Sequence, residues 1–154
     1  MIGHTRFLMI AAMVTGLMTS PAHAETKLAG HWAQADFNDP CSLVFGFLLK
    51  ADGSADVDWV ESKWNAAKNK VEFSKGRREG RWSAKDDTLH LAVVEVETNP
   101  KVLKLFDKTG PVTKTTNIDA TVTADGNVLN ATVKAQNIEQ KVFSFNCVYN
   151  RDEQ

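Results

Sequence analysis

The sequence predicts an all-β domain, an antiparallel up-and-down barrel of eight to nine strands that is closed by one disulfide bond. Three observations predict it. Apolar and polar residues alternate with a period of two along residues 28–150, and no segment shows a long stripe with the 3.6-residue period of a helix. Turn-forming residues separate the alternating runs. The two cysteines, Cys41 and Cys147, lie near opposite ends of the predicted domain.

The first 24 residues have the three-part pattern of a secretory signal peptide. Met1–Arg6 is weakly basic, Phe7–Met18 is apolar, and Ala22-His23-Ala24 is a small-x-small cleavage site. The apolar run is shorter than the about 20 residues that a transmembrane helix needs. We therefore expect cleavage after Ala24, a single domain over residues 25–154, a periplasmic or secreted location, and no membrane span.

Successive alternating segments are separated by residues that favour tight turns. Asp52-Gly53, Lys85-Asp86-Asp87 and Asp125-Gly126-Asn127 tolerate the positive φ of hairpin turns, which predicts antiparallel pairing of neighbouring strands. Pro100–Gly110 departs from the pattern, and the sequence leaves open whether it forms a short helix or an edge strand. The expected strands are Leu28–Phe37, Ser42–Lys50, Ala55–Val60, Val71–Ser74, Arg78–Ala84, Thr88–Glu97, Thr115–Thr123, Val128–Gln136 and Lys141–Asn150.

Both cysteines fall on the apolar faces of their strands. Cys41 is in phase with Leu43, Phe45, Phe47 and Leu49, and Cys147 is in phase with Phe143, Phe145 and Tyr149. An oxidising compartment makes a Cys41–Cys147 bridge the expected state, and the long loop that it closes is worth up to about 4–5 kcal/mol in the chain-entropy model. The bridge would join the last strand to the first two, which closes the sheet into a barrel.

The opening segment Leu28-Ala29-Gly30-His31-Trp32 resembles the G-x-W first strand of lipocalins and the wider calycin group. In that family the Trp plugs one end of an up-and-down barrel, and an arginine near the end of the last strand lies over it. Arg151 occupies about that position, so the resemblance implies that Arg151 covers Trp32. The same opening, followed by Cys41-Ser42-Leu43, is also similar to small periplasmic metalloprotease inhibitors, which are eight-stranded barrels.

Aromatic residues on the predicted strands are the candidates to line a ligand cavity. A barrel of about eight strands holds either packed side chains or one small molecule, so the sequence leaves open whether the interior is a cavity or a filled core. The residues expected to line a ligand are Trp32, Trp59, Trp82, Phe45, Phe47, Phe143 and Phe145.

A basic segment is the candidate partner surface. Lys63–Lys85 holds eight basic and two acidic residues, although the whole chain has a net charge of −1. Such a segment can attract an anionic ligand, a glycan or an acidic protein, whereas the slightly acidic total argues against nucleic acid. The expected partner-facing residues are Trp64, Arg77, Arg78 and Arg81.

Metal and catalytic motifs are weak. Asp52–Asp58 begins with the spacing of a calcium loop, but Val57 and Lys63 stand where that loop needs Gly and Glu. His31 and His90, the histidines after residue 24, have no Cys or His at ligand spacing and are expected on strand surfaces. No nucleophile elbow is visible, and we expect no metal, no cofactor and no enzymatic activity.

The sequence therefore predicts a binding protein that holds a small apolar or amphipathic ligand in its barrel. The alternative is a proteinaceous inhibitor or partner-binding module of the cell envelope, which would use the barrel rim, the N-terminal arm Glu25–Leu28 or the edge between Trp64 and Arg81. The carrier needs a cavity of about 300 Å³ or more with an open mouth. The inhibitor needs a filled core with exposed aromatic anchors on a rim.

Overall fold

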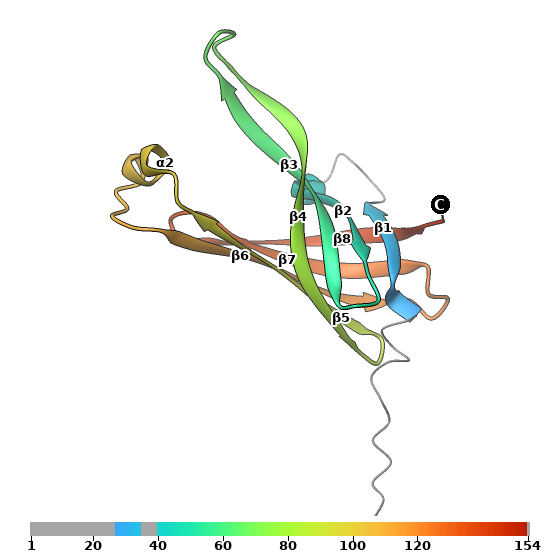
Figure 1. Cartoon of the computed structure of the whole chain (residues 1–154). Helices are drawn as coiled ribbons and strands as arrows, with labels where there is room; N and C mark the ends of the chain where they lie inside the picture. Colours follow the sequence, from blue (N-terminus) through green and yellow to red (C-terminus); the bar gives the residue numbers. More distant parts are fainter. Residues whose placement is uncertain (1–26, 35–39, 154) are drawn as a thin grey trace, which may run out of the picture.

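The structure, a computed structural model, describes residues 27–34 and 40–153. Within them, eight strands form one closed barrel in chain order, and all neighbours, including β1 and β8, pair antiparallel (Figure 1). The predicted up-and-down barrel is confirmed, while the predicted signal peptide, residues 1–24, lies outside the described residues. The strands are β1 (Gly30–Gln34), β2 (Val44–Leu49), β3 (Ser54–Asn65), β4 (Lys70–Lys85), β5 (Thr88–Glu97), β6 (Val112–Val122), β7 (Val128–Gln136) and β8 (Val142–Asp152).

The barrel has eight strands and not the nine segments predicted, because two of those segments form a single strand. Val71–Ser74 and Arg78–Ala84 both belong to β4, which runs through Gly76 without a turn. The reason is pairing with β3, which extends to Asn65 and keeps an unbroken ladder with β4. A Cβ atom at Gly76 would lie 2.4 Å from the carboxylate of Glu61, so a larger residue there would make the exposed Glu61 side chain move.

Other boundaries also differ from the prediction: β3, β6 and β8 are Ser54–Asn65, Val112–Val122 and Val142–Asp152 instead of Ala55–Val60, Thr115–Thr123 and Lys141–Asn150. The strand expected over Ser42–Lys50 begins only at Val44, after the short 3-10 helix η1 (Pro40–Leu43). The first strand is described from Gly30 to Gln34, and its predicted end at Phe37 lies outside the described residues.

The open question about Pro100–Gly110 resolves to a helix, α2 (Pro100–Leu105). Pro100 occupies the first turn, where its missing N–H costs nothing, and the side chain of Asn99 accepts a hydrogen bond from the Lys101 amide at 3.0 Å. A proline start and an asparagine cap favour a helix over an edge strand. Among the described residues, no helix is long and apolar enough to cross a membrane.

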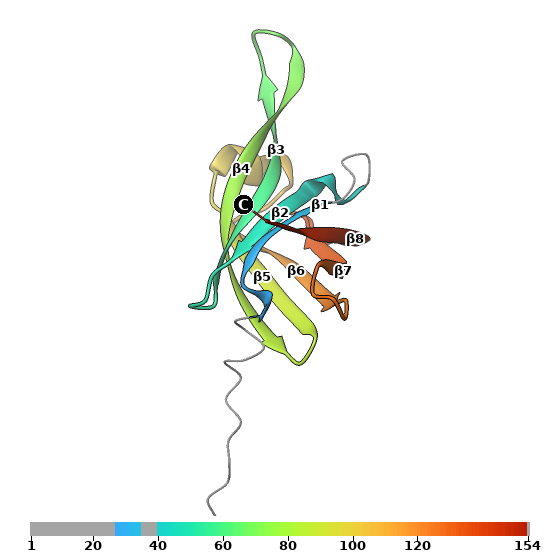
Figure 2. The ribbon, with the colours of Figure 1, turned by 90° about the vertical axis from the view of Figure 1, so that its right-hand side faces the viewer.

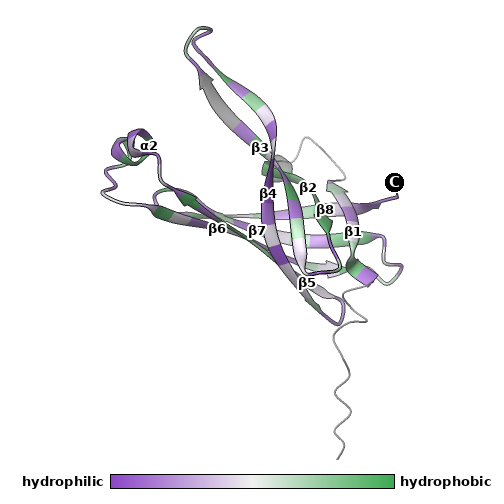
Figure 3. Ribbon diagram, in the orientation of Figure 1, coloured by the Kyte–Doolittle hydropathy of each residue, from purple (hydrophilic) through white to green (hydrophobic). Residues whose placement is uncertain are grey.

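The disulfide joins the expected residues. Cys41 of η1 is bonded to Cys147 of β8, with Cα atoms 5.7 Å apart, and both residues are buried. Colouring by hydropathy shows apolar and polar positions alternating along the barrel strands, as expected for one inner and one outer face (Figure 3).

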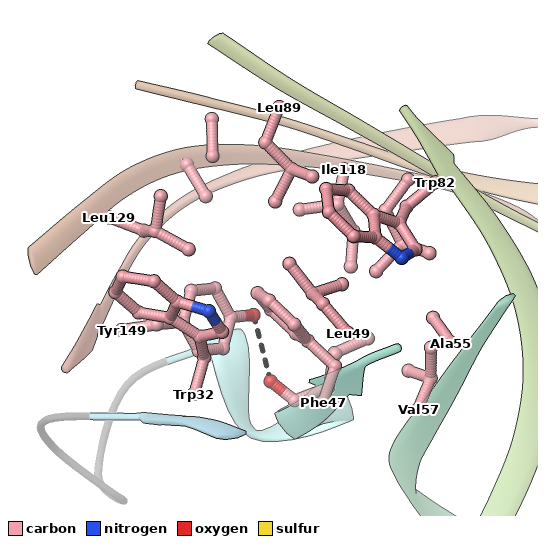
Figure 4. Close-up of a cluster of buried hydrophobic side chains, with 14 of the residues drawn as sticks. Trp32, Phe47, Leu49, Ala55, Val57, Trp82, Leu89, Ile118, Leu129 and Tyr149 are labelled. Atoms are coloured by element: carbon pink, nitrogen blue, oxygen red, sulfur yellow. Dashed lines mark hydrogen bonds between the residues drawn. The ribbon is translucent and has the colours of Figure 1, made fainter. Parts of the chain in front are cut away.

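One end of the barrel is filled by large side chains. Trp32, Phe47 and Tyr149 are fully buried there, and the Tyr149 hydroxyl donates to the Val44 carbonyl at 2.9 Å (Figure 4). Arg151 lies over the Trp32 ring, 4.4 Å from its centre, and donates to the backbone carbonyls of Lys27, Ala29 and Gly126. The predicted cover of Trp32 by Arg151 is confirmed, although Arg151 lies within β8 rather than beyond it.

Candidate functional site

The two ends of the barrel differ, and the second end carries a pocket. The β3–β4 hairpin, the β5–β6 connection with α2 and the β7–β8 turn all lie at this second end, which we call the open end (Figure 1). A pocket of about 670 Å³ lies there. Its apolar lining is Leu43, Trp59, Val60, Val102, Ala135, Ile138 and Phe143, and its polar lining is Glu61, Arg78, Glu95, Glu97, Lys114, Thr116, Gln136 and Asn137.

The pocket exists because two neighbouring strands separate. The ladder between β4 and β5 begins at the tight turn, with Lys85 opposite Thr88, and ends at Arg81 opposite Ala92. Beyond that pair, β4 follows β3 and β5 follows β6. The inner faces of the separated strands therefore carry side chains that meet a pocket rather than the opposite wall of the barrel.

An ion-pair cluster crosses the gap between the separated strands. Arg78 of β4 bonds the carboxylate of Glu95 on β5, and its guanidinium also lies 3.5 Å from the carboxylate of Glu61. The same guanidinium lies over the Trp59 ring, 4.5 Å from its centre. Arg78 and Glu95 hold the positions at which the ladder would continue, so a side-chain contact replaces the backbone pairing there. A planar guanidinium suits this role because it can stack on a ring and pair with carboxylates at once.

The expected ligand-lining residues divide between the two ends. Trp59 and Phe143 line the pocket. Trp32, Trp82 and Phe47 belong to the filled half of the barrel, and the Trp82 indole donates to the Lys50 carbonyl at 2.8 Å. Phe145, half-buried, packs against the core cluster.

The predicted inward face of β2 is wrong at Phe45. The register with β3 shifts between Val44 and Gly46, which makes Phe45 the extra residue of a β-bulge. Phe45 consequently lies in a surface depression with Asp58 and Arg77, and the Lys75 ammonium sits 5.1 Å from its ring centre. Phe45 is therefore not among the residues that line the pocket at the open end.

The expected partner-facing residues also divide. Arg77 is exposed and pairs with Asp58 on the outer side of the hairpin, at 3.3 Å. Arg81 is exposed on β4. Arg78 is not on this outer surface, because it belongs to the pocket lining. The backbone of Trp64 pairs with Val71, and its side chain lies outside the described part of the chain.

Sequence reasoning missed Gln34. It is in phase with Trp32 on β1 and only 6% exposed, and both polar atoms of its side chain are buried without a hydrogen-bond partner in the described structure. A polar residue in phase with Trp32 was the available signal. Unpaired buried amides are uncommon and costly, so Gln34 marks a local defect in the barrel interior.

The two histidines lie on strand surfaces, as predicted. His90 is exposed and bonds Asp119 at 2.6 Å, while His31 is partly exposed and bonds Asp152 at 3.0 Å. Asp52, the first residue of the weak calcium-like segment, accepts hydrogen bonds from the backbone and hydroxyl of Ser54, and these bonds lower the pKa of its carboxyl. Over residues 27–34 and 40–153, no three His, Cys, Asp or Glu side chains are grouped as metal ligands would be.

Comparisons with protein-family models, with curated proteins and with solved structures found no match for this chain.

Proposed function

We propose that this chain is a binding protein, not a catalyst, and that it holds a small amphipathic ligand in the open-end pocket of a lipocalin-like barrel. The observation that carries the proposal is the pocket itself, whose volume of about 670 Å³ is within the range of small-molecule sites. The Trp32–Arg151 contact at the filled end supports the lipocalin likeness. The Cys41–Cys147 bond supports an oxidising compartment such as the periplasm or the exterior.

The chemistry of the lining favours an amphipathic ligand. Val102 and Phe143 offer apolar surface to a hydrocarbon or ring system, whereas the Trp59 ring is only 8% exposed and lies beneath the Arg78 guanidinium. Arg78 pairs with Glu61 and Glu95, while Glu97 and Lys114 add one charge of each sign to the lining. The lining therefore has a net charge of only −1, and the polar group of a ligand would exchange hydrogen bonds with these charged side chains while its apolar part covers Phe143.

Titration with a fluorescent fatty-acid probe tests the proposal. Trp59 lies in the pocket, so saturable quenching of tryptophan emission at one-to-one stoichiometry is expected. Phe143→Ala should weaken probe binding by about fivefold to tenfold, as expected for the loss of a large apolar contact. Phe143 is 48% exposed, so this substitution should leave the fold intact.

Phe106→Ala is the matched control. Phe106 is 42% exposed, follows α2 and does not line the pocket, so its loss should leave probe affinity unchanged. A folded, disulfide-bonded protein that gives no saturable response would overturn the proposal. Equal loss of affinity in both variants would overturn the assignment of the site.

The envelope-inhibitor alternative has one observation in its favour, since Phe73 on the β3–β4 hairpin is 74% exposed. That alternative also needs a filled interior, whereas the open end holds a pocket. The N-terminal arm gives it little support, because Leu28 is buried in the core and Glu25 lies outside the described residues. The carrier is therefore the function that the geometry supports best.

A further inference from the structure

The tip of the β3–β4 hairpin stands outside the barrel. Val60–Asn65 and Lys70–Lys75 pair with each other and with no other described strand, so they form a two-stranded ribbon that projects past the open end (Figure 2). Such ribbons are marginally stable in water when nothing else packs on them. We call these residues and the turn between them the ribbon.

The ribbon and α2 both expose large apolar side chains at the open end. On the ribbon, Phe73 is 74% exposed and Val71 is 47% exposed. At α2, Leu105 is 80% exposed and Phe106 is 42% exposed. Both elements project beyond the barrel body on the side of the pocket (Figure 1). Large apolar side chains that are exposed on projecting elements are typical of a contact surface.

The same two elements are basic. Residues 60–75, the ribbon, hold four basic residues and two acidic residues, and residues 99–110 hold three basic residues and one acidic residue. Each segment carries a net charge of +2 in a chain whose total is −1, so the remainder of the chain is acidic. Positive charge is therefore concentrated at the open end, where it would orient the molecule toward an anionic surface.

We propose that the open end docks on an anionic lipid surface, with Phe73 and Leu105 at the hydrocarbon boundary and the neighbouring lysines at the headgroup phosphates. Exposed apolar side chains beside lysines are the chemistry of proteins that bind in the bilayer interface. The basic side chains can reach the headgroups while their carbon stems follow the apolar groups inward. Mobile lipid headgroups can contact two separate projections at once more easily than one rigid protein surface can.

This inference does not depend on the pocket being a ligand site. If both proposals hold, docking brings the mouth of the pocket to the lipid surface, where an amphipathic ligand could enter. If the pocket binds nothing, the docking surface is unaffected. Vesicle binding and probe binding are therefore measured separately, and each can fail alone.

Vesicle co-sedimentation of the disulfide-bonded protein tests the docking proposal. Vesicles of phosphatidylglycerol at low salt should bind the protein at least about tenfold more tightly than vesicles of phosphatidylcholine, and about 0.5 M NaCl should remove most of this binding because it screens exposed charges. Phe73→Ser should weaken binding to phosphatidylglycerol by about fivefold or more. The double variant Lys70→Glu/Lys75→Glu should weaken it by at least about tenfold.

Two variants on the barrel wall serve as matched controls. Val148→Ser changes an exposed apolar residue of β8, and Lys134→Glu reverses an exposed charge of β7, so both should bind vesicles like the native chain. Equal binding to the two lipids, or native-like binding by Phe73→Ser, would overturn the proposal. It would also be overturned if polyglutamate bound as tightly as the vesicles and Phe73→Ser weakened neither, because the surface would then suit an acidic protein.

Discussion

At the scale of single residues, Gln34 places a primary amide inside the barrel. Both polar atoms of its side chain are buried without a partner in the described structure. Leaving a buried donor or acceptor unpaired costs about 1–3 kcal/mol. Folding therefore loses free energy at this position that an apolar side chain of similar volume would not lose.

We expect Gln34→Leu to raise the free energy of unfolding by about 1–2 kcal/mol, because leucine removes the unpaired amide and keeps most of the buried volume. Urea denaturation followed by tryptophan fluorescence measures the change. Gln136→Leu is the control, since the Gln136 amide bonds Gln140 at 2.8 Å and its loss should bring no gain. A destabilised Gln34→Leu protein would show that the amide has a favourable role.

Asp125 makes the stability of the folded protein depend on pH through a hydrogen-bonded turn. Thr123 and the Asn127 amide donate to its carboxylate, and these bonds hold its pKa below the ordinary value of 3.8. Since the folded pKa is the lower one, the stabilisation is present above pH 3.8 and is lost as the pH falls through the folded value. Asp125→Asn should therefore lose stability less steeply than the native chain between about pH 5 and pH 2.

Denaturation midpoints at several pH values measure this slope. Glu79→Gln is a suitable control, because Glu79 is exposed and its side chain forms no hydrogen bond or ion pair within the described structure. Identical slopes for native protein and Asp125→Asn would remove Asp125 as a source of acid sensitivity.

The sequence was most informative at residues whose role is local or tied to a short motif. The contact of Arg151 with Trp32 was predicted from the G-x-W motif, and the turn at Asp125 was predicted from the residues that follow it. Phe45 was not, because a β-bulge reverses the face of one residue without leaving a mark in the alternation itself. The inward position of Arg78 was also missed, since an arginine between Arg77 and Glu79 has the pattern of a solvent-facing surface, and its partner Glu95 lies on a different strand.

At the scale of elements, β5 and β7 have the predicted bounds, because their alternation is unbroken and clear stop signals flank them, which are turns around β7 and a turn and the Asn99-Pro100 helix start around β5. The β3–β4 hairpin was harder to predict. Lys75-Gly76-Arg77 has the composition of a turn, and only its pairing with Val60, Trp59 and Asp58 makes it strand. Tertiary pairing overrides local preference there, and one sequence does not reveal which residues pair.

The ribbon should be the least protected part of the hairpin. Val60–Asn65 and Lys70–Lys75 have hydrogen-bonded neighbours on one side only, whereas Ala55–Val57 of the same hairpin pairs with both β2 and β4. Local opening is easier where few buried contacts resist it. We expect ribbon amides to exchange hydrogen at least about tenfold faster than those of Ala55–Val57, as measured by mass spectrometry.

Anionic vesicles extend this measurement. Protection of the ribbon that rises on addition of phosphatidylglycerol vesicles would agree with docking, while protection of Ala55–Val57 should not change. Equal exchange along the whole hairpin in the free protein would mean that the ribbon is as stable as the barrel wall.

At the scale of the whole molecule, closure and asymmetry have different origins. Closure comes from β1, a short strand that pairs with both β2 and β8 and so joins the two ends of the sheet. Asymmetry comes from the separation of β4 and β5. Where these strands pair, side chains fill the interior, and where they separate, a pocket remains. A regular ladder between β4 and β5 would remove both the gap and the Arg78 cluster that crosses it.

The Cys41–Cys147 bond anchors η1, and with it the chain that leads into β2, to the middle of β8. It spans 106 residues, so in the chain-entropy model its loss costs up to about 4–5 kcal/mol through the greater freedom of the unfolded chain. Cys41→Ser and Cys147→Ser should each lower the melting temperature under oxidising conditions, and the native chain with dithiothreitol should melt at a similarly reduced temperature. The double variant should be indifferent to the reductant. If Cys147→Ser melts at the native temperature, the barrel is held by β1 pairing and core packing alone, and the covalent link contributes nothing to its closure.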